Sequence, residues 1–243
     1  MDFLTLDNIN MSFGSHYVLK NINLSVKDGE FVTILGPSGS GKSTLFHLIG
    51  GILQPDTGHI YLNNKDITGT KGHISYMPQA PSLFPWRTIL DNVMLGQELS
   101  GKKEIEKAIA MLNKASLSSF MDEYPSALSG GMKQRASFIR ALLSAKDLLL
   151  LDEPFGALDE FTRLDMQKWL LSIWEEYKRT VLFITHNIEE ALFLSDRILI
   201  LSANPASIIK EMIVPFPRPR NPELWLEEEF LQYKKEVYSY LKG

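Results

Sequence analysis

The first third of the chain contains short apolar segments of two different patterns. Residues 18–26 alternate apolar and polar positions, and Lys27-Asp28-Gly29 then turns the chain into the apolar run 30–35. Alternation is typical of a strand with one buried face, whereas a continuous apolar run indicates a strand buried on both faces. We therefore expect a hairpin followed by a buried strand, with further strands at residues 60–62 and 74–77.

Helical periodicity dominates the middle of the chain. Ile105, Ile109 and Leu112 recur at helical spacing. A second apolar face of the same period is formed by Met132, Ala136, Ile139 and Leu143. These patterns predict an inserted helical subdomain over about residues 81–145.

The last third returns to apolar runs of strand length. Residues 148–151 and 181–184 are two such runs, separated by a helical segment at 163–178, and residues 198–201 form another. Apolar strands joined by helices indicate a parallel sheet with crossover connections. The predicted fold class is therefore α/β, with a mainly parallel core sheet, an N-terminal antiparallel β subdomain and the inserted helical subdomain.

Prolines mark the start of a separate tail. Residues 214–222 contain four prolines, which remove backbone donors and restrict their neighbours. Neither a regular helix nor a central strand is expected there, so we interpret the segment as a linker to a final helix at 224–241. The predicted division is a body of residues 1–213 and a tail of residues 214–243.

Composition narrows the class of protein. A chain of 243 residues with 44% hydrophobic content can bury a substantial core. A net charge of −4 argues against sequence-independent nucleic-acid binding, so we expect no nucleic-acid partner and interpret Lys102-Lys103 and Lys234-Lys235 as solvated helix faces. The lack of cysteine excludes disulfides and cysteine-ligated metal, which fits a reducing interior.

Export and membrane insertion are not expected from the sequence. The N-terminus lacks the positive flank and apolar run of a secretory signal. No apolar stretch approaches the roughly 18 residues that are needed to cross a bilayer. Any membrane role is therefore expected to be peripheral.

A phosphate-binding loop follows the buried strand at 30–35. Its residues are Gly36, Pro37, Ser38, Gly39, Ser40, Gly41, Lys42, Ser43 and Thr44, and an apolar helix is predicted over residues 42–53. The order of strand, glycine-rich loop and helix is what a nucleotide-binding loop requires, and it disfavours an ordinary glycine turn. We expect backbone N–H groups of residues 39–43 to wrap the β-phosphate of ATP, Lys42 to lie between the β- and γ-phosphates, and Ser43 to bind Mg²⁺.

A second anion site is predicted at Ser129-Gly130-Gly131, where a hydroxyl and unshielded N–H groups precede a helix. Because the chain already has a phosphate loop, this second site is best explained if it serves a nucleotide held by another copy. The arrangement resembles the ATP-binding cassette (ABC) family, in which the signature of one subunit closes over ATP bound to its partner. The resemblance covers about residues 3–207.

The resemblance implies roles for residues near the ends of the predicted strands. Asp152 follows four leucines, where open α/β sheets place their ligands, and is expected to orient Mg²⁺. Glu153 resembles the family's general base, His186 its switch histidine, and Gln79 its hinge glutamine, which links Mg²⁺ and the attacking water to the helical insert. Asp159 is placed among the nucleotide-binding residues. The alternative for the Asp152-Glu153 pair is two exposed carboxylates after a strand.

The adenine contact is left open between two aromatic residues. Phe13 aligns with the family's stacking aromatic, Tyr17 competes with it, and a core role for Phe13 is a third possibility. The remaining histidines show no comparable placement and are interpreted as ordinary; they are His16, His47, His59 and His73.

The segment 82–88 points to a membrane partner. It places large apolar groups in a proline-bounded and exposed stretch just after Gln79, where the family receives its membrane subunit; a buried loop anchor is the alternative. Three features resemble the ATPase subunits of nitrate, sulfonate and taurine importers: the stretch Leu83-Phe84-Pro85-Trp86, the run 188–197 and the Pro-Arg-rich tail. Met132 stands where the family often has glutamine, and Phe138-Ile139 is less usual, which weakens any claim about one substrate.

The resemblance implies an ATPase subunit at the cytoplasmic face of a membrane. Its expected partners are a second ATPase subunit, membrane permease subunits and, indirectly, an extracytoplasmic solute-binding protein. The alternatives are the ATPase of an exporter or cell-envelope complex and a soluble cassette acting on ribosomes or DNA repair. A small-molecule kinase is disfavoured, because the signature would have no role in it.

Overall fold

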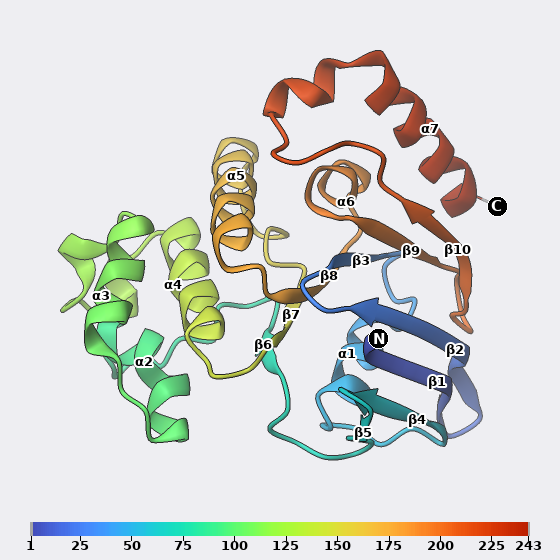
Figure 1. Ribbon diagram of the computed structural model, residues 1–243, viewed down its shortest axis with the longest axis horizontal. Coiled ribbons are helices and arrows are strands. Elements are labelled where there is room, and N and C mark those ends of the chain that lie inside the picture. Colours follow the sequence, from blue (N-terminus) through green and yellow to red (C-terminus); the bar gives the residue numbers. More distant parts are fainter. Residues whose placement is uncertain (1, 243) are drawn as a thin grey trace.

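The structure is a computed structural model that describes residues 2–242, and it contains two sheets (Figure 1). The first sheet is antiparallel, with four strands in the order β2-β1-β4-β5. Its strands are β1 (Asp2–Phe13), β2 (His16–Lys27), β4 (Thr57–Leu62) and β5 (Lys65–Asp66). The predicted antiparallel subdomain is therefore confirmed.

The second sheet is central, with the order β10-β9-β3-β8-β7-β6. All neighbouring pairs in it are parallel except β9 and β10, which are antiparallel. Its strands are β3 (Phe31–Leu35), β6 (Ser75–Met77), β7 (Leu148–Asp152), β8 (Thr180–Thr185), β9 (Arg197–Leu201) and β10 (Ile208–Ile213). Every residue of β3, β7 and β8 is buried, as their continuous apolar runs predict.

Successive side chains of the central strands pack into two different hydrophobic clusters, one on each face of the sheet. In β3, Phe31 and Leu35 join a cluster with the helices after residue 88, whereas Val32 and Ile34 join one with α1 (Lys42–Ile49) and the antiparallel sheet. The period of two in strand side chains produces this division. The central sheet is consequently covered on both faces.

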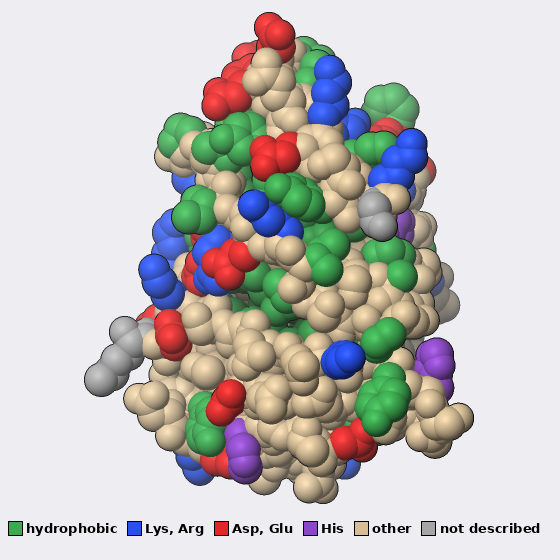
Figure 2. Space-filling model, turned by 90° about the vertical axis from the view of Figure 1, so that its right-hand side faces the viewer, with side chains coloured by type: hydrophobic (Ala, Val, Ile, Leu, Met, Phe, Trp, Pro, Cys, Tyr) green, Lys and Arg blue, Asp and Glu red, His purple; other side chains and the backbone are tan. Residues whose placement is uncertain are grey.

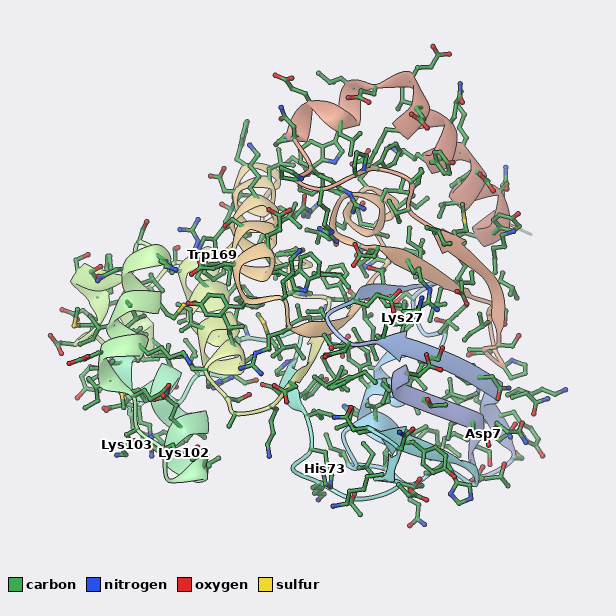
Figure 3. The ribbon with its side chains drawn as sticks, viewed as in Figure 1. Asp7, Lys27, His73, Lys102, Lys103 and Trp169 are labelled. Carbon is green, nitrogen blue, oxygen red and sulfur yellow. The ribbon has the colours of Figure 1, made fainter. Side chains whose placement is uncertain are left out.

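The predicted helical insert lies between β6 and β7 and forms a lobe of its own, on the left of Figure 1. Its helices are α2 (Ile89–Ser100), α3 (Ile105–Lys114) and α4 (Gly130–Leu142), with 3-10 turns at Ser118–Phe120 and Pro125–Ala127. The lobe is tied to the body through α5 (Glu160–Tyr177), since Trp169 of α5 packs edge-on against Phe138 of α4 at 5.3 Å between ring centroids (Figure 3).

Two local predictions near the N-terminus are corrected by the structure. The turn at 27–29 does not close a hairpin, because half-buried β2 and fully buried β3 belong to different sheets; the hairpin is β1–β2. The helix predicted over residues 42–53 ends at Ile49. Two residues later, Gly51 has φ of 67°, which a helix cannot continue. An added Cβ on Gly51 would lie 2.1 Å from the Thr70 carbonyl oxygen.

Two further differences concern a helix face and a strand that the sequence did not predict. Ile105 is half exposed, because it lies at the first position of α3, before the buried residues Ala108 and Met111. The strand β10 was not predicted, since Lys210 and Glu211 interrupt its apolar residues; as an edge strand it exposes alternate positions.

The tail packs on the body. Residues 214–221 form no regular element, as predicted, and the final helix α7 (Glu228–Lys242) starts later than expected, after a 3-10 turn at Pro222–Leu226. In Figure 1 the tail lies over α6 (Ile188–Leu194). Arg220 is buried and donates to the carbonyl oxygens of Leu192, Phe193 and Ser195, so it caps the carboxyl end of α6.

The helices and the charges on one face bear on the expected membrane and nucleic-acid roles. Among residues 2–242 no helix is both long and apolar enough to cross a membrane. On the face shown in Figure 2, Lys and Arg side chains are interspersed with Asp and Glu. Lys102 and Lys103 are exposed at the far end of the helical lobe, as expected, but they lie in the loop between α2 and α3 and not on a helix face (Figure 3).

Candidate functional site

The phosphate loop connects β3 to α1 in the way its sequence predicts. Gly41 has φ of 92°, and an added Cβ would lie 2.8 Å from a Val18 methyl carbon, so only glycine fits there. Among the described residues no side chain caps α1, and the buried Ser40 hydroxyl has no hydrogen-bond partner. Uncapped N–H groups at a helix start, beside an unpaired hydroxyl, fit a bound phosphate.

Lys42 holds its ammonium against the loop. Its Nζ donates to the carbonyl oxygens of Gly36 at 3.0 Å and Pro37 at 2.7 Å. Burial lowers the pKa of Lys42, and the nearby Glu153 and Asp152 carboxylates oppose that shift. A positive charge is therefore held between the loop and two acidic side chains.

A cavity of about 490 Å³ joins the phosphate loop to two other predicted site residues, Gln79 and Glu153. The loop residues that line it are Ser38, Gly39, Gly41, Lys42, Ser43 and Thr44. His16, Val18 and Asn204 complete the lining. The structure thus brings residues that are more than 100 positions apart into one site. His16, interpreted as ordinary from the sequence, lies at this site.

Asp152 ends β7 beside the first turn of α1. Tyr76 donates its hydroxyl to Asp152 Oδ2 at 3.1 Å. Burial raises the pKa of Asp152, while hydrogen bonds from Ser43 and Tyr76 oppose the rise. The oxygen atoms of Ser43, Asp152 and Gln79 are hard donors, which is the donor chemistry that Mg²⁺ takes. Tyr76 was missed, although its place in a short strand that ends two residues before Gln79 is a usable signal.

Glu153 is the next residue, and its backbone is strained. Its φ of 43° is left-handed, a conformation that costs about 1–3 kcal/mol for a residue other than glycine. Its N–H donates to the Ile184 carbonyl at 3.0 Å, which fixes it to the end of the neighbouring strand β8. Glu153 Oε2 lies 3.1 Å from Nδ1 of His186, the residue after β8. The predicted base and switch histidine are therefore in contact.

Gln79 connects the site to the helical lobe. Its carbonyl oxygen accepts from Nε2 of Gln134 on α4 at 3.1 Å, and Gln134 is buried. Arg140, also on α4, donates to the carbonyl oxygens of Pro81 at 2.9 Å and Ser82 at 2.7 Å. Gln79 and the residues directly after it are thus held to the helix that follows the signature.

The signature lies at the start of α4, as predicted. Ser129 caps the helix by accepting from Met132 N at 3.4 Å, and Ser129 and Gly130 are exposed. An added Cβ on Gly131 would lie 2.6 Å from the Thr162 methyl carbon, so the signature packs closely on the start of α5. Asp159 caps α5 by accepting from Thr162 N at 3.1 Å. Within residues 2–242, the lining of the phosphate-loop cavity includes neither the signature nor Asp159.

The register of β1 and β2 bears on the adenine contact. Phe13 pairs with His16, and Ser12 pairs with Tyr17. Paired residues project from the same face, so Phe13 shares a face with His16, which lines the cavity. Tyr17 lines an adjacent cavity of about 480 Å³, which shares His16 and Asn204 with the first. Phe13 is 51% exposed and Tyr17 62%, which excludes a core role for Phe13.

Comparisons with known proteins agree with this geometry. The model of the ABC transporter family matches residues 19–156. The chain is 44% identical over 226 residues to the aliphatic sulfonates import ATP-binding protein of Bacillus cereus, covering 92% of this chain and 88% of that protein. It is 42% identical over 246 residues to the formylaminopyrimidine import ATP-binding protein of Halalkalibacterium halodurans, covering 99% of this chain and 96% of that protein.

A solved structure extends the comparison to three dimensions. An ATP-binding cassette in a dimeric post-hydrolysis state with ADP and Pi matches with a TM-score of 0.75 and 31% sequence identity. The match covers 88% of this chain and 100% of that chain. Fold and sequence therefore point to the same class of nucleotide-hydrolysing domain.

Proposed function

The chain belongs to the ABC transporter family and is an ATPase, and from this premise we propose that it is the ATP-hydrolysing subunit of a small-solute importer. The import of sulfonates and of a formylaminopyrimidine by two similar proteins supports the importer class. Their different solutes leave the substrate at the level of a small organic or inorganic solute, including nitrate-, sulfonate- and taurine-like compounds.

The observation that carries the proposal is the separation of the signature from the phosphate loop. The cavity at the loop is lined by Gln79 and Glu153, whereas the exposed Ser129 and Gly130 lie at the start of a helix in the other lobe. One chain therefore supplies the phosphate-loop half of one site and the signature half of another. Two copies would complete two ATP sites, as the dimeric state of the similar cassette supports.

Each residue of the cavity then has a role in ATP hydrolysis. The N–H groups of residues 39–43 hold the β-phosphate, and Lys42 neutralises charge on the β- and γ-phosphates. Ser43, Asp152 and Gln79 would hold Mg²⁺, which supplies positive charge to the phosphate oxygens. Glu153 takes a proton from the attacking water, and His186, 3.1 Å away, orients that carboxylate beside the γ-phosphate.

The segment 82–88 gives the ATPase a surface for the membrane subunit. Trp86 is 71% exposed, and its ring lies 5.1 Å from that of Phe84. The buried Asn92 side chain holds the backbone of this segment through bonds to Phe84 N, Phe84 O, Arg87 O and Thr88 O. A rigid loop with an exposed aromatic group, next to Gln79, suits transmission of movement from the ATP site to a permease at the cytoplasmic face of the membrane.

The test is gentle affinity purification of the tagged chain from its native membranes, with mass spectrometry of the proteins that co-purify. We expect a polytopic membrane subunit and an extracytoplasmic solute-binding protein. Trp86→Ala should lose the membrane subunit, whereas Tyr238→Ala, an exposed aromatic on the tail helix α7, should keep it. A membrane subunit without a binding protein would favour an exporter, and ribosomal or DNA-repair proteins would contradict transport.

A further inference from the structure

A buried carboxylate that the proposed chemistry does not use lies directly behind the switch histidine. Glu190 of α6 is 5% exposed. Its Oε2 accepts from the Thr185 hydroxyl at 2.5 Å, and its Oε1 accepts from Nε2 of Gln167 on α5 at 3.2 Å. Burial raises the pKa of Glu190, and these hydrogen bonds and Arg163 oppose the rise. A carboxylate is costly to bury, so its position in the fold calls for a physical explanation.

Glu190 fixes the turn that carries His186. The Thr185 hydroxyl, which donates to Glu190, also accepts from Asn187 N at 3.0 Å. The Asn187 side chain in turn caps α6 by accepting from Glu190 N at 3.2 Å. The residues on both sides of His186 are therefore joined to each other and to the Glu190 carboxylate. His186 itself is exposed and is held from behind.

Arg163 of α5 approaches the other oxygen of the same carboxylate, Oε1, which also accepts from Gln167. Its guanidinium donates to the Leu158 carbonyl at 3.0 Å, next to Asp159 at the start of α5. Its Nε lies 3.9 Å from Glu190 Oε1, which is too far for a direct hydrogen bond. Within the described chain this buried Nε has no hydrogen-bond partner.

A small cavity lies between these groups. It has a volume of about 40 Å³ and is lined by Glu153, Arg163, His186 and Glu190, together with Gly156, Thr185 and Asn187. A water molecule needs a cavity of roughly 10–15 Å³ and two to four polar partners. The unpaired Nε and the Oε1 atom supply a donor and an acceptor at a separation that a water bridges.

We propose that Arg163 and Glu190, bridged by water in this cavity, are positioning residues that hold His186 and Glu153 in working orientation. This proposal rests on the catalytic roles assigned above to Glu153 and His186. The pair links the segment that ends at Asp159 to the turn that carries His186. These two segments should therefore move together when the ATP site closes. Neither residue touches ATP.

The test compares steady-state ATP hydrolysis by the full chain and by Glu190→Gln, Arg163→Met and the double variant. Each single change should lower kcat about tenfold, the low end of what supporting partners of catalytic groups cost, with KM for ATP little changed. The double variant should lose no more than the worse single variant, because the two residues act as one unit. Arg163 is 24% exposed, so its variant is expected to fold even if Glu190→Gln does not.

A matched ion pair distinguishes positioning from stability. Glu30 and Arg197 lie 2.8 Å apart with similarly low exposure, 11% and 14%, and Glu30 precedes β3 at the other end of the sheet. Glu30→Gln should lower the melting temperature and leave kcat unchanged. The proposal is wrong if Glu190→Gln and Arg163→Met only lower the melting temperature, or if Glu30→Gln lowers kcat equally.

Failure of the catalytic assignment would look different. If Glu153→Gln keeps full ATPase activity, the proposed role of Glu153 fails whatever the Arg163 and Glu190 variants do. If Glu153→Gln is inactive and both positioning variants keep the normal kcat, only the further inference fails. A high-resolution crystal structure with no water between Arg163 Nε and Glu190 Oε1 would also contradict the bridge.

Discussion

The two ends of the central sheet are built differently. At the carboxyl end, Glu153 has a left-handed backbone, and the buried Ser40 hydroxyl and Arg163 Nε have no partner among residues 2–242. At the amino end, Glu30 pairs with Arg197, and the Phe31 N–H donates to Asp196 Oδ2. The strained carboxylate and these unpaired groups lie where ATP is proposed to bind. At the amino end, ion pairs and backbone hydrogen bonds join β3 to β9 and stabilise the fold, and the unpaired buried atoms there, Arg218 Nη1 and Glu175 Oε1, lie outside the proposed site.

The tail adds contacts at the amino end of the central sheet. Arg218 donates to Asp196 Oδ1 at 2.8 Å and lies over the Trp174 ring, with its guanidinium carbon 4.1 Å from the centroid. Burial lowers the pKa of Arg220 to about 10, so this guanidinium stays charged at neutral pH. Function at one end and stability at the other should be separable by mutation.

The largest effect is expected from Glu153→Gln. Loss of a general base costs about 10²- to 10⁴-fold in rate, equivalent to roughly 3–5 kcal/mol of barrier. ATP binding should persist, so the variant should accumulate as an ATP-bound dimer. ATPase assays and light scattering with saturating ATP check this, with Glu176→Gln on the exposed side of α5 as the control. A monomer under saturating ATP would count against the two-site dimer.

Arg220→Met should lower stability at the amino end of the central sheet. Removing the guanidinium leaves buried carbonyls at the end of α6 without their donor, which should lower the free energy of unfolding by about 2 kcal/mol. The kcat for ATP should stay normal at temperatures well below the melting point. Lys235→Met removes an exposed charge from the same tail and should change neither quantity. A fall in kcat with Arg220→Met would show that the tail acts on the site.

Gly41→Ala tests whether the loop needs its glycine for shape. The alanine would need φ of 92° and would place Cβ 2.8 Å from Val18, so we expect at least a tenfold loss of ATP affinity, about 1.4 kcal/mol. Gly14→Ala shares the left-handed conformation, with φ of 61°, but meets no heavy atom of the described chain within 4 Å. Titration with a fluorescent nucleotide should show normal affinity for Gly14→Ala. Equal losses would mean that backbone strain alone, rather than the Val18 contact, is responsible.

The sequence predicted the carboxyl end of the sheet better than its surroundings. The phosphate loop, Asp152, Glu153 and the His186 position follow from local order, because a motif and its flanking strand lie together in the chain. The false hairpin at 27–29 arose because strand pairing is decided by tertiary packing, which local alternation does not report. The short α1 is different, since Gly50-Gly51 is a local helix-stop signal that the apolar pattern obscured.

Residues that reach the site only through tertiary contacts could not be found from the sequence. Glu190 lies four residues after His186, on a short helix whose last five residues are all buried, and only the structure brings it to Thr185 and Arg163. Asn204 likewise reaches the phosphate-loop cavity because its loop is held to β2, where Ala206 N donates to the Val18 carbonyl. Spacing along the chain contains no information on either contact.

The smallest effect concerns the margin of the site, where the antiparallel sheet approaches the phosphate loop. Phe13→Ala should weaken ATP binding by about 1 kcal/mol, the low end for a base stacked on an aromatic ring, because Phe13 is half exposed. Tyr17→Ala should leave affinity unchanged, since Tyr17 projects with Ser12 from the other face. Isothermal titration with ATP and with triphosphate alone separates a base contact from a phosphate contact. The reverse order of effects would assign the stacking to Tyr17 and place the base in the adjacent cavity.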